Sequence, residues 1–154
     1  GRRSGSGSSS EGGVGSGSDE SGAHALPRLR HRLRGSVGSA DFGAALRCLR
    51  LRTPLAAGDD ACAPLPRGHF SGRIALLRRG NCMFAVKAAH AQAAGAVAVL
   101  IHDPHDAPPG GAFALGGDGV HDAGVHIAVL SIERDSAQEL REALRAADAV
   151  ASVG

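Results

Sequence analysis

The clearest pattern of apolar and polar positions lies in Gly72–Ile101. Arg73–Leu77 is a short aliphatic run between glycines, which is typical of a buried strand. Apolar residues then recur at helical spacing; we expect Asn81 to cap this helix and Gly95 to end it in the left-handed conformation. Val97–Ile101 is a second buried aliphatic run. The segment therefore predicts a strand, a helix and a parallel strand.

The C-terminal third predicts a second unit of the same kind. Ile127–Ile132 is an aliphatic run, and Ser136 with Glu139 forms a capping box that would open a helix. Asp148–Val153 alternates between polar and apolar residues, as an edge strand does. The apolar stripe of the helix comprises Leu140, Ala143, Leu144 and Ala147.

The N-terminal region has a different composition. Gly and Ser make up 16 of the first 22 residues, so we expect a flexible linker over residues 1–26 and one folded domain over residues 27–154. Arg28–Arg34 and Leu46–Thr53 alternate as half-buried strands would. Their arginines, which include Arg47, Arg50 and Arg52, could instead form a patch that binds nucleic acid or an anionic membrane surface.

Charge and composition narrow the functional classes. The net charge is +2, and Lys87 is the single lysine among 17 basic residues, which indicates a compositional bias toward arginine. Aromatic residues make up 3% of the chain, and none is interleaved with the arginines for base stacking. No apolar run approaches the roughly 18 residues of a membrane span. We therefore predict neither a nucleic-acid partner nor a membrane span in this chain.

The loop after Ile101 contains candidate metal ligands. The loop is rich in histidine and aspartate, which can bind zinc or a pair of metal ions and support a metal-dependent hydrolase. Its proline and glycine content would not hold such ligands rigidly, so we predict no metal site and expect Phe113 and Leu115 to anchor the loop on the core. The candidate ligands are His102, Asp103, His105, Asp106, Asp118, His121, Asp122 and His126.

The chain has three cysteines, Cys48, Cys62 and Cys82, so one is left over from any pairing. Pro54–Phe70 is rich in turn-forming residues and predicts a loop that carries Cys62. Cys82 precedes a helix start, where a reactive thiolate would be stabilised. The alternative, which we favour, is a disulfide between Cys62 and Cys82 in an oxidising compartment.

The run RRGNCMFAVKAAHAQAAGAVAVLI, residues 78–101, resembles the core signature of the protease-associated (PA) domain family. The resemblance extends over residues 36–150. It implies a mixed α/β (α+β) fold, an open barrel- or sandwich-like sheet flanked by two main helices, and Cys62 as the usual disulfide partner of Cys82. The family commonly has Ile-Pro where this chain has Ile127-Ala128, which affects the local loop geometry rather than the fold.

Within the family, the segment CMFAVKA, Cys82–Ala88, is most similar to the PA domain of ER degradation-enhancing α-mannosidase-like proteins. That resemblance implies a parent glycosidase acting on misfolded glycoproteins in the endoplasmic reticulum, with calcium in its own catalytic domain. Plant vacuolar sorting receptors and intramembrane signal-peptide-peptidase-like proteases have similar wording and are the alternatives. In each case this chain would be a non-catalytic module of the secretory-pathway lumen, without a cofactor of its own. It would bind protein or peptide segments, glycoproteins, or the catalytic domain of its own parent.

The similarity to sorting receptors implies that the turn before the helix faces the ligand. The predicted binding residues are Arg79, Gly80, Asn81 and Met83, and no catalytic residue is predicted. Arg79 could donate to a carboxylate or a carbonyl. Alternatively, Arg79 is merely solvated and the turn only carries the disulfide. We expect Phe84 in the core and Lys87 at the surface.

Overall fold

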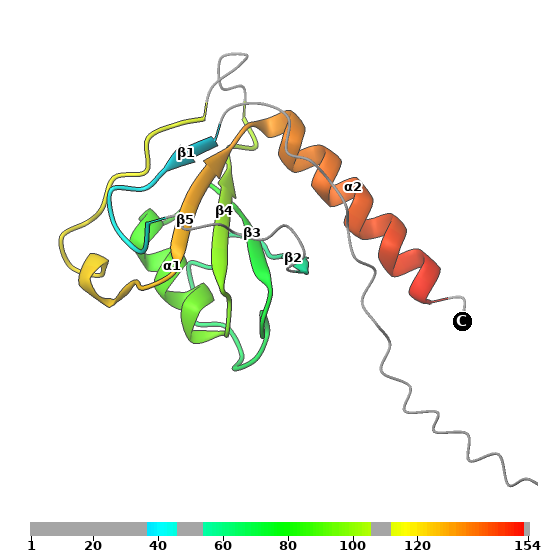
Figure 1. Cartoon of the computed structure of the whole chain (residues 1–154), viewed down its shortest axis with the longest axis horizontal. Coiled ribbons are helices and arrows are strands. Elements are labelled where there is room, and N and C mark those ends of the chain that lie inside the picture. Colours follow the sequence, from blue (N-terminus) through cyan, green and yellow to red (C-terminus); the bar gives the residue numbers. More distant parts are fainter. Residues whose placement is uncertain (1–36, 46–53, 106–111, 153–154) are drawn as a thin grey trace, which may run out of the picture.

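The structure, a computed structural model, describes residues 37–45, 54–105 and 112–152. These residues form a five-stranded sheet in the order β1-β5-β4-β3-β2, flanked by two longer helices (Figure 1). The mixed α/β fold with two main helices is thereby confirmed. The elements are β1 (Val37–Ser39), β2 (Leu55–Ala57), β3 (Ile74–Arg78), α1 (Phe84–Ala93), β4 (Ala98–His102), a 3₁₀ turn (Asp122–Gly124), β5 (Ala128–Ile132) and α2 (Arg134–Ala151).

Four of the five strands run parallel, and β1 is antiparallel to β5. The predicted strand, helix and strand over Gly72–Ile101 are present, because β3 and β4 pair in parallel from Ile74↔Ala98 to Arg78↔His102. All five residues of β4 and all five of β5 are buried. Such strands read as continuous apolar runs because a parallel sheet is covered on both faces.

One face of the sheet packs against α1 through small side chains. Ala85, Ala88 and Ala91 of α1 have no exposed surface, and they belong to the same core cluster as Val99 and Ile101 of β4. Alanine has a minimal side chain and loses almost no side-chain entropy in a helix, so it suits a helix packed directly on a sheet.

The helix α1 ends as predicted at a left-handed glycine. Gly95 has φ of +94°. Its N–H donates to Gln92 O, and the N–H of Ala96 donates to Ala91 O, which is the Schellman arrangement of a helix C-terminus.

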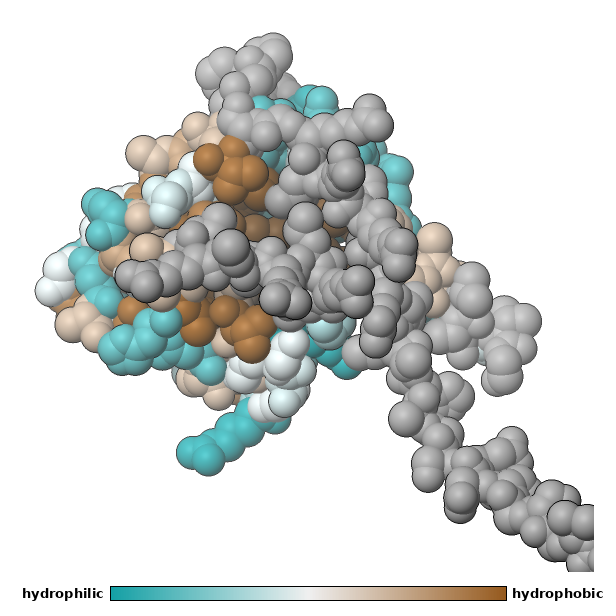
Figure 2. Space-filling view, viewed as in Figure 1, coloured by the Kyte–Doolittle hydropathy of each residue, from teal (hydrophilic) through white to brown (hydrophobic). Residues whose placement is uncertain are grey.

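The other face of the sheet packs against the first part of α2. Leu76, Leu100 and Leu130, one from each of β3, β4 and β5, form a second core cluster with Ala137 and Leu140 of α2. In Figure 1 the C-terminal part of α2 extends beyond the sheet. Figure 2, drawn from the same side, shows the visible apolar surface gathered over the sheet, with polar surface around it.

Two predictions about α2 are wrong. The helix begins at Arg134, two residues before the predicted capping box, because the Glu133 carbonyl already accepts the Ala137 N–H. Residues 148–151 of the predicted edge strand Asp148–Val153 instead form the end of this helix, and the Ser152 N–H still donates to Asp148 O. The two alanines of this segment have high helix propensity, and among the described residues no strand pairs with it.

Two short strands escaped the sequence analysis. β2 lies within the predicted loop Pro54–Phe70, and β1 pairs with β5 at the opposite edge. Three-residue strands carry almost no periodic signal, and pairing with a longer neighbour defines them. The strands predicted at Arg28–Arg34 and Leu46–Thr53 lie outside the described residues.

The loop before β5 is anchored as expected. Leu115 is 2% exposed and Phe113 packs against the α1-side core. No helix within the described ranges is both long and apolar enough to cross a membrane.

We expect Gly95→Ala to lower the free energy of unfolding by about 1–2 kcal/mol. The positive φ strains any L side chain, and a Cβ would lie 3.0 Å from the backbone of Ser71. Gly116→Ala is the matched control, because a Cβ there meets nothing within 4 Å. Urea unfolding measures both; equal stabilities of the two variants would contradict the assigned role of Gly95.

Candidate functional site

The candidate site lies at the carboxyl edge of the parallel strands. β3 ends at Arg78 and β4 at His102, and the Arg79 N–H donates to His102 O over 2.8 Å just beyond the last pair. The turn Arg79–Met83 and the segment Asp103–His105 therefore leave the sheet side by side. Crevices outside the carboxyl ends of parallel strands are where open α/β sheets place their ligands.

The turn is joined covalently to the loop after β2. Cys62 and Cys82 form a disulfide with an S–S distance of 2.05 Å, which confirms the predicted pairing. A reactive thiolate at Cys82 is therefore not what this structure shows. Cys48 lies outside the described residues.

Asp60 holds the same turn through hydrogen bonds. The Asn81 amide donates to Asp60 Oδ2 over 2.5 Å, and the Cys62 N–H donates to Asp60 Oδ1 over 3.1 Å. These donors, the Asn81 amide first, lower the pKa of Asp60 because they favour its charged form. Asn81 has φ of +67° and does not cap α1; the N-cap is Met83, without a side-chain cap. The predicted cap is wrong because the side chain of Asn81 is already used across the turn.

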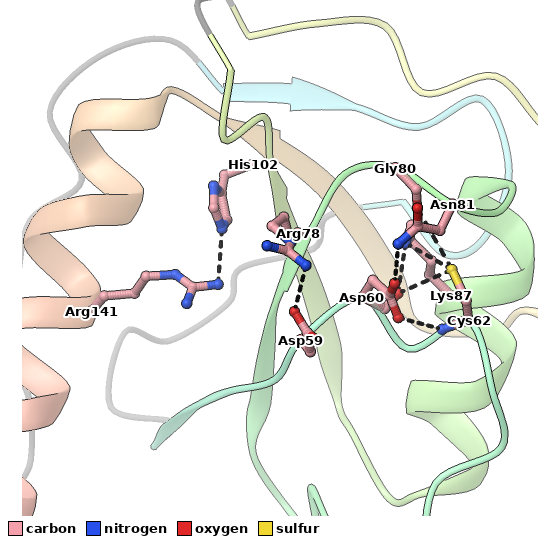
Figure 3. Close-up of polar contacts among 9 residues, drawn as sticks. All are labelled: Asp59, Asp60, Cys62, Arg78, Gly80, Asn81, Lys87, His102 and Arg141. Carbon is pink, nitrogen blue, oxygen red and sulfur yellow. Dashed lines mark hydrogen bonds and ion pairs between the residues drawn. The ribbon is translucent and has the colours of Figure 1, made fainter.

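Lys87 is buried rather than exposed, so its predicted surface position is wrong. It has no exposed surface, and its ammonium donates to Asp60 O over 2.6 Å and lies 3.3 Å from Cys62 Sγ (Figure 3). Burial lowers its pKa, and the charge of Asp60 partly offsets that effect. One turn further along α1, His90 Nδ1 lies 2.8 Å from Ala61 O. Helix α1 thus holds the Asp60–Cys62 segment beneath the turn.

We call this set of contacts the turn clasp: the interactions of Asp60 and Cys62 with Asn81, Cys82 and Lys87. Periodicity could not have found its two charged members. Lys87 occupies a position that helical spacing does not mark as apolar, and Asp60 lies in an irregular loop. The signal that could have pointed to Lys87 is its being the single lysine of the chain, next to a cysteine pair.

Arg79 is neither free nor simply solvated. Its Nη1 donates to Asp103 Oδ2 over 2.8 Å, and its guanidinium lies 4.9 Å from the ring centre of Phe113 and 5.9 Å from that of Phe84. Phe84 is partly buried against the core, as expected. An ion pair and two ring contacts restrict the side chain, while 46% of it remains exposed.

An open hollow of about 360 Å³ lies between the turn and the segment after β4. We call it the turn hollow. Three of the four predicted binding residues line it, and Met83 follows them in the turn, 51% exposed. The hollow is lined by Arg78, Arg79, Gly80, Asn81, Asp103, Pro104 and His105.

Polar groups of the histidine- and aspartate-rich loop bond to other groups of the protein. Asp103 pairs with Arg79, and Asp118 accepts from the N–H groups of His121 and Val120 and lies 2.6 Å from His121 Nδ1. These bonds hold the pKa of Asp118 down at about 2. Asp106 lies outside the described residues. Within the part of the chain that the structure describes, no three potential ligands come together as a metal site.

His102 is the last residue of β4, and its side chain contacts α2. It is 6% exposed, and Arg141 Nη2 lies 3.0 Å from its Nε2. Burial lowers the pKa of His102 to about 4, the charges of Arg141 and Arg78 act in the same direction, and Asp103 opposes them. The imidazole is therefore neutral at physiological pH.

Comparison with known proteins decides the family. The model of the PA domain family matches residues 45–140. The chain belongs to the PA domain family. This confirms the family that the run at residues 78–101 resembles.

Curated relatives of this PA domain are plant proteins. It is 49% identical to signal peptide peptidase-like 3 of Arabidopsis thaliana over 74 residues, which is 44% of this chain and 14% of that protein. It is 50% identical to signal peptide peptidase-like 2 of the same plant over 42 residues, 27% of this chain and 8% of that protein. The chain thus spans a small part of these relatives.

Solved structures support the fold. A zinc aminopeptidase from Bacillus subtilis superposes with a TM-score of 0.56 at 25% identity, over 68% of this chain and 25% of that enzyme. An aminopeptidase from Aneurinibacillus sp. strain AM-1 gives a TM-score of 0.51 at 24% identity, over 72% of this chain and 25% of the other. The PA domain thus corresponds to about a quarter of each of these enzymes.

We expect replacement of Cys62 and Cys82 by serine to lower the free energy of unfolding by about 3 kcal/mol, because a loop of 20 residues is no longer closed in the unfolded chain. Chemical denaturation without reductant measures this loss. Cys48→Ser is the matched control: it keeps the Cys62–Cys82 disulfide, so added reductant should lower its free energy of unfolding as it lowers that of the wild type. A loss below about 1 kcal/mol in the double variant would contradict the role of the disulfide.

We expect His102 to make stability depend on pH. The unfolded imidazole has a pKa of about 6.5 and the folded one of about 4. Between these values the unfolded chain binds a proton that the folded protein does not. The free energy of unfolding that this pKa difference contributes is therefore fully present above pH 6.5. It is lost as the pH falls toward 4, by about 1–2 kcal/mol after allowing for solvent screening.

Unfolding free energies at pH 7 and 4.5 test this dependence. His102→Gln should lose less stability over that interval than the wild type, and the exposed His69→Gln should lose as much as the wild type. Equal losses in all three proteins would show that His102 does not carry the dependence.

Proposed function

We propose that this PA domain is a non-catalytic peptide-binding module of a signal-peptide-peptidase-like intramembrane protease, and that the turn hollow is its binding surface. The family match and the two plant relatives support the parent. The observation that carries the binding surface is the turn itself, which is held rigidly and open at the carboxyl edge of the sheet. In this proposal catalysis belongs to the rest of the parent.

The chemistry of the turn hollow suits an extended peptide segment. Asp103 occupies one guanidinium nitrogen of Arg79 and leaves its other N–H groups without an acceptor among the described residues. Those groups can donate to a peptide carbonyl or a carboxylate. Gly80 adds backbone with open space around its Cα, and Met83 adds exposed, adaptable apolar surface.

A rigid turn can bind a peptide more tightly than a flexible one that makes the same few contacts. The turn clasp fixes the backbone from below, and Asp103 with Phe113 fixes the side chain of Arg79. A surface already ordered before binding loses little conformational entropy when a peptide docks. The stapled turn is therefore better suited to recognition than a free loop of the same composition.

The comparisons favour the protease parent over the mannosidase parent that the CMFAVKA wording indicates, because both curated relatives reported above are signal peptide peptidase-like proteins. With such a parent the domain would lie in the lumen of the secretory pathway, beside a membrane, and its partners would be peptide segments or the parent's own catalytic domain. The boundary between a linker at 1–26 and a domain at 27–154, and the absence of a cofactor, remain predictions.

Selection from a random 12-residue peptide library on the immobilised chain tests the proposal. We expect selected peptides to bind the wild type, and Arg79→Gln and Met83→Ser to weaken binding about tenfold, or about 1.4 kcal/mol each, since Arg79 lines the hollow and Met83 is exposed beside it in the same turn. Calorimetry with the selected peptides gives the affinities.

Two matched controls accompany these variants. Arg67→Gln removes an exposed arginine elsewhere, and Val120→Ser removes an exposed apolar residue that is 77% accessible. Both should bind as the wild type does. Peptides that bind all variants equally would place recognition elsewhere on the domain, and a failure to select any binder would contradict a peptide-binding function.

A further inference from the structure

The two edges of the sheet differ in how they are covered. Just after β1, Ala40 forms a parallel bridge with Leu115, and the Asp41 N–H donates to Leu115 O over 3.3 Å, so the loop before β5 lies along that edge. At the opposite edge β2 pairs with β3 on one side, and no strand of the described residues pairs with its other side. Within the described part of the chain, β2 is therefore the open edge of the sheet.

The backbone of this open edge carries hydrogen-bonding groups that point away from β3. Pro54 O accepts a hydrogen bond from β3, and the Gly58 N–H donates one to β3, each over 2.9 Å. Successive residues of a strand direct these groups to opposite sides, so the N–H and C=O groups of Leu55 and Ala57 face outward. None of the four has a hydrogen-bond partner among the described residues. They are the donors and acceptors to which a further strand can pair.

A cleft of about 290 Å³ lies between β2 and α2. We call it the β2 cleft. Leu144 and Ala147 form its apolar wall on the helix, and both are only partly buried, whereas Leu140 of the same stripe is buried against the sheet. In Figure 1 this C-terminal part of α2 extends beyond the sheet. The apolar stripe of α2 thus continues past the last strand, over space that a sixth strand would fill.

The charged side chains of the β2 cleft favour an acidic partner. Arg73, just before β3, and Arg145 of α2 line the cleft, and neither forms an ion pair with a carboxylate of the described residues. Arg141 also lines it, but its guanidinium is directed at His102, with Nη2 3.0 Å from the imidazole Nε2. Asp148 is the one carboxylate among the described lining residues. The excess of positive charge attracts acidic side chains and repels basic ones.

We propose that the open edge of β2 binds an extended, acidic peptide segment of a partner protein, as a sixth strand beneath the C-terminal part of α2. The peptide backbone bonds to the outward groups of Leu55 and Ala57, which supplies affinity for any extended sequence. Its side chains on the face of α2 contact Leu144, and acidic ones pair with Arg73 or Arg145, which supplies selectivity. The β2 cleft shares no lining residue with the turn hollow, so this site does not depend on the proposed peptide function there.

NMR of the full ¹⁵N-labelled chain tests the proposal with two capped nine-residue peptides, one alternating glutamate with valine and the other lysine with valine. We expect the glutamate peptide to shift the amide signals of Leu55 and Ala57 saturably and to slow their exchange with solvent about tenfold at saturation. The lysine peptide should bind about tenfold more weakly. Equal binding of the two peptides, or no saturable shift at Leu55 and Ala57, would overturn the proposal.

The same spectra show whether the edge is already occupied. Slow exchange of the Leu55 and Ala57 amides without peptide would overturn the proposal. If that slow exchange depends on protein concentration, the occupant is a second copy of this chain. If it does not, the occupant is another segment of the same chain.

Two variants separate the contribution of the backbone from that of the charge. Ala57→Pro removes an outward N–H and keeps the Gly58 N–H that bonds to β3, and edge strands tolerate proline. It should raise the half-saturating concentration of the glutamate peptide at least about tenfold. Arg145→Glu, at an exposed position, should raise it about fivefold and strengthen binding of the lysine peptide. Should Ala57→Pro fail to fold, Arg145→Glu still decides the outcome.

Arg79→Gln is the matched control, because it changes the turn hollow and leaves the β2 cleft intact. It should bind the glutamate peptide as the wild type does. Loss of binding in Arg79→Gln would place this peptide at the turn hollow and overturn the proposal. Half-saturation unaltered in Arg145→Glu, or in a folded Ala57→Pro, would also overturn it.

Discussion

The turn clasp is the constraint on which the candidate site depends. The Asp60–Cys62 segment follows the edge strand β2, and the turn at Asn81–Cys82 follows β3. A disulfide, the Asp60 carboxylate and the buried ammonium of Lys87 join the two segments. A buried charge is tolerated only with close polar partners, so Lys87 also determines where the Asp60 carbonyl must lie. Without the clasp the turn would be an ordinary glycine-containing loop.

The parallel sheet explains where the turn hollow lies. The carboxyl ends of β3 and β4 lie side by side, and their last residues, Arg78 and His102, are register partners. One of the segments that follow these ends leads into α1 and the other into the long loop, while a single residue, Glu133, separates β5 from α2. The turn hollow therefore opens on the side of the disulfide, and α2 covers the other side of the strand end at His102. This hollow presents a rigid turn at the surface.

Sequence reasoning found the long elements and missed features set by distant contacts. β3, β4, β5 and α1 were predicted because buried runs of five residues and an alanine-rich helix give a strong periodic signal. The short β2 escaped because it is a strand only through pairing with β3. Asn81 was assigned to a cap because its residue type suits one, yet its side chain bonds to Asp60, 21 positions away. No local pattern encodes such a contact.

The sequence by itself determined the PA family and the sheet-forming core, because these rest on local periodicity and on a dense signature at residues 78–101, and it favoured the Cys62–Cys82 pair that the structure confirms. Only the tertiary structure decided that Lys87 is buried, that Arg79 is paired with Asp103, and that His102 meets Arg141. These outcomes depend on which strand ends become neighbours. Burial and pairing of a charge are properties of that three-dimensional arrangement, and the residue types alone leave them open.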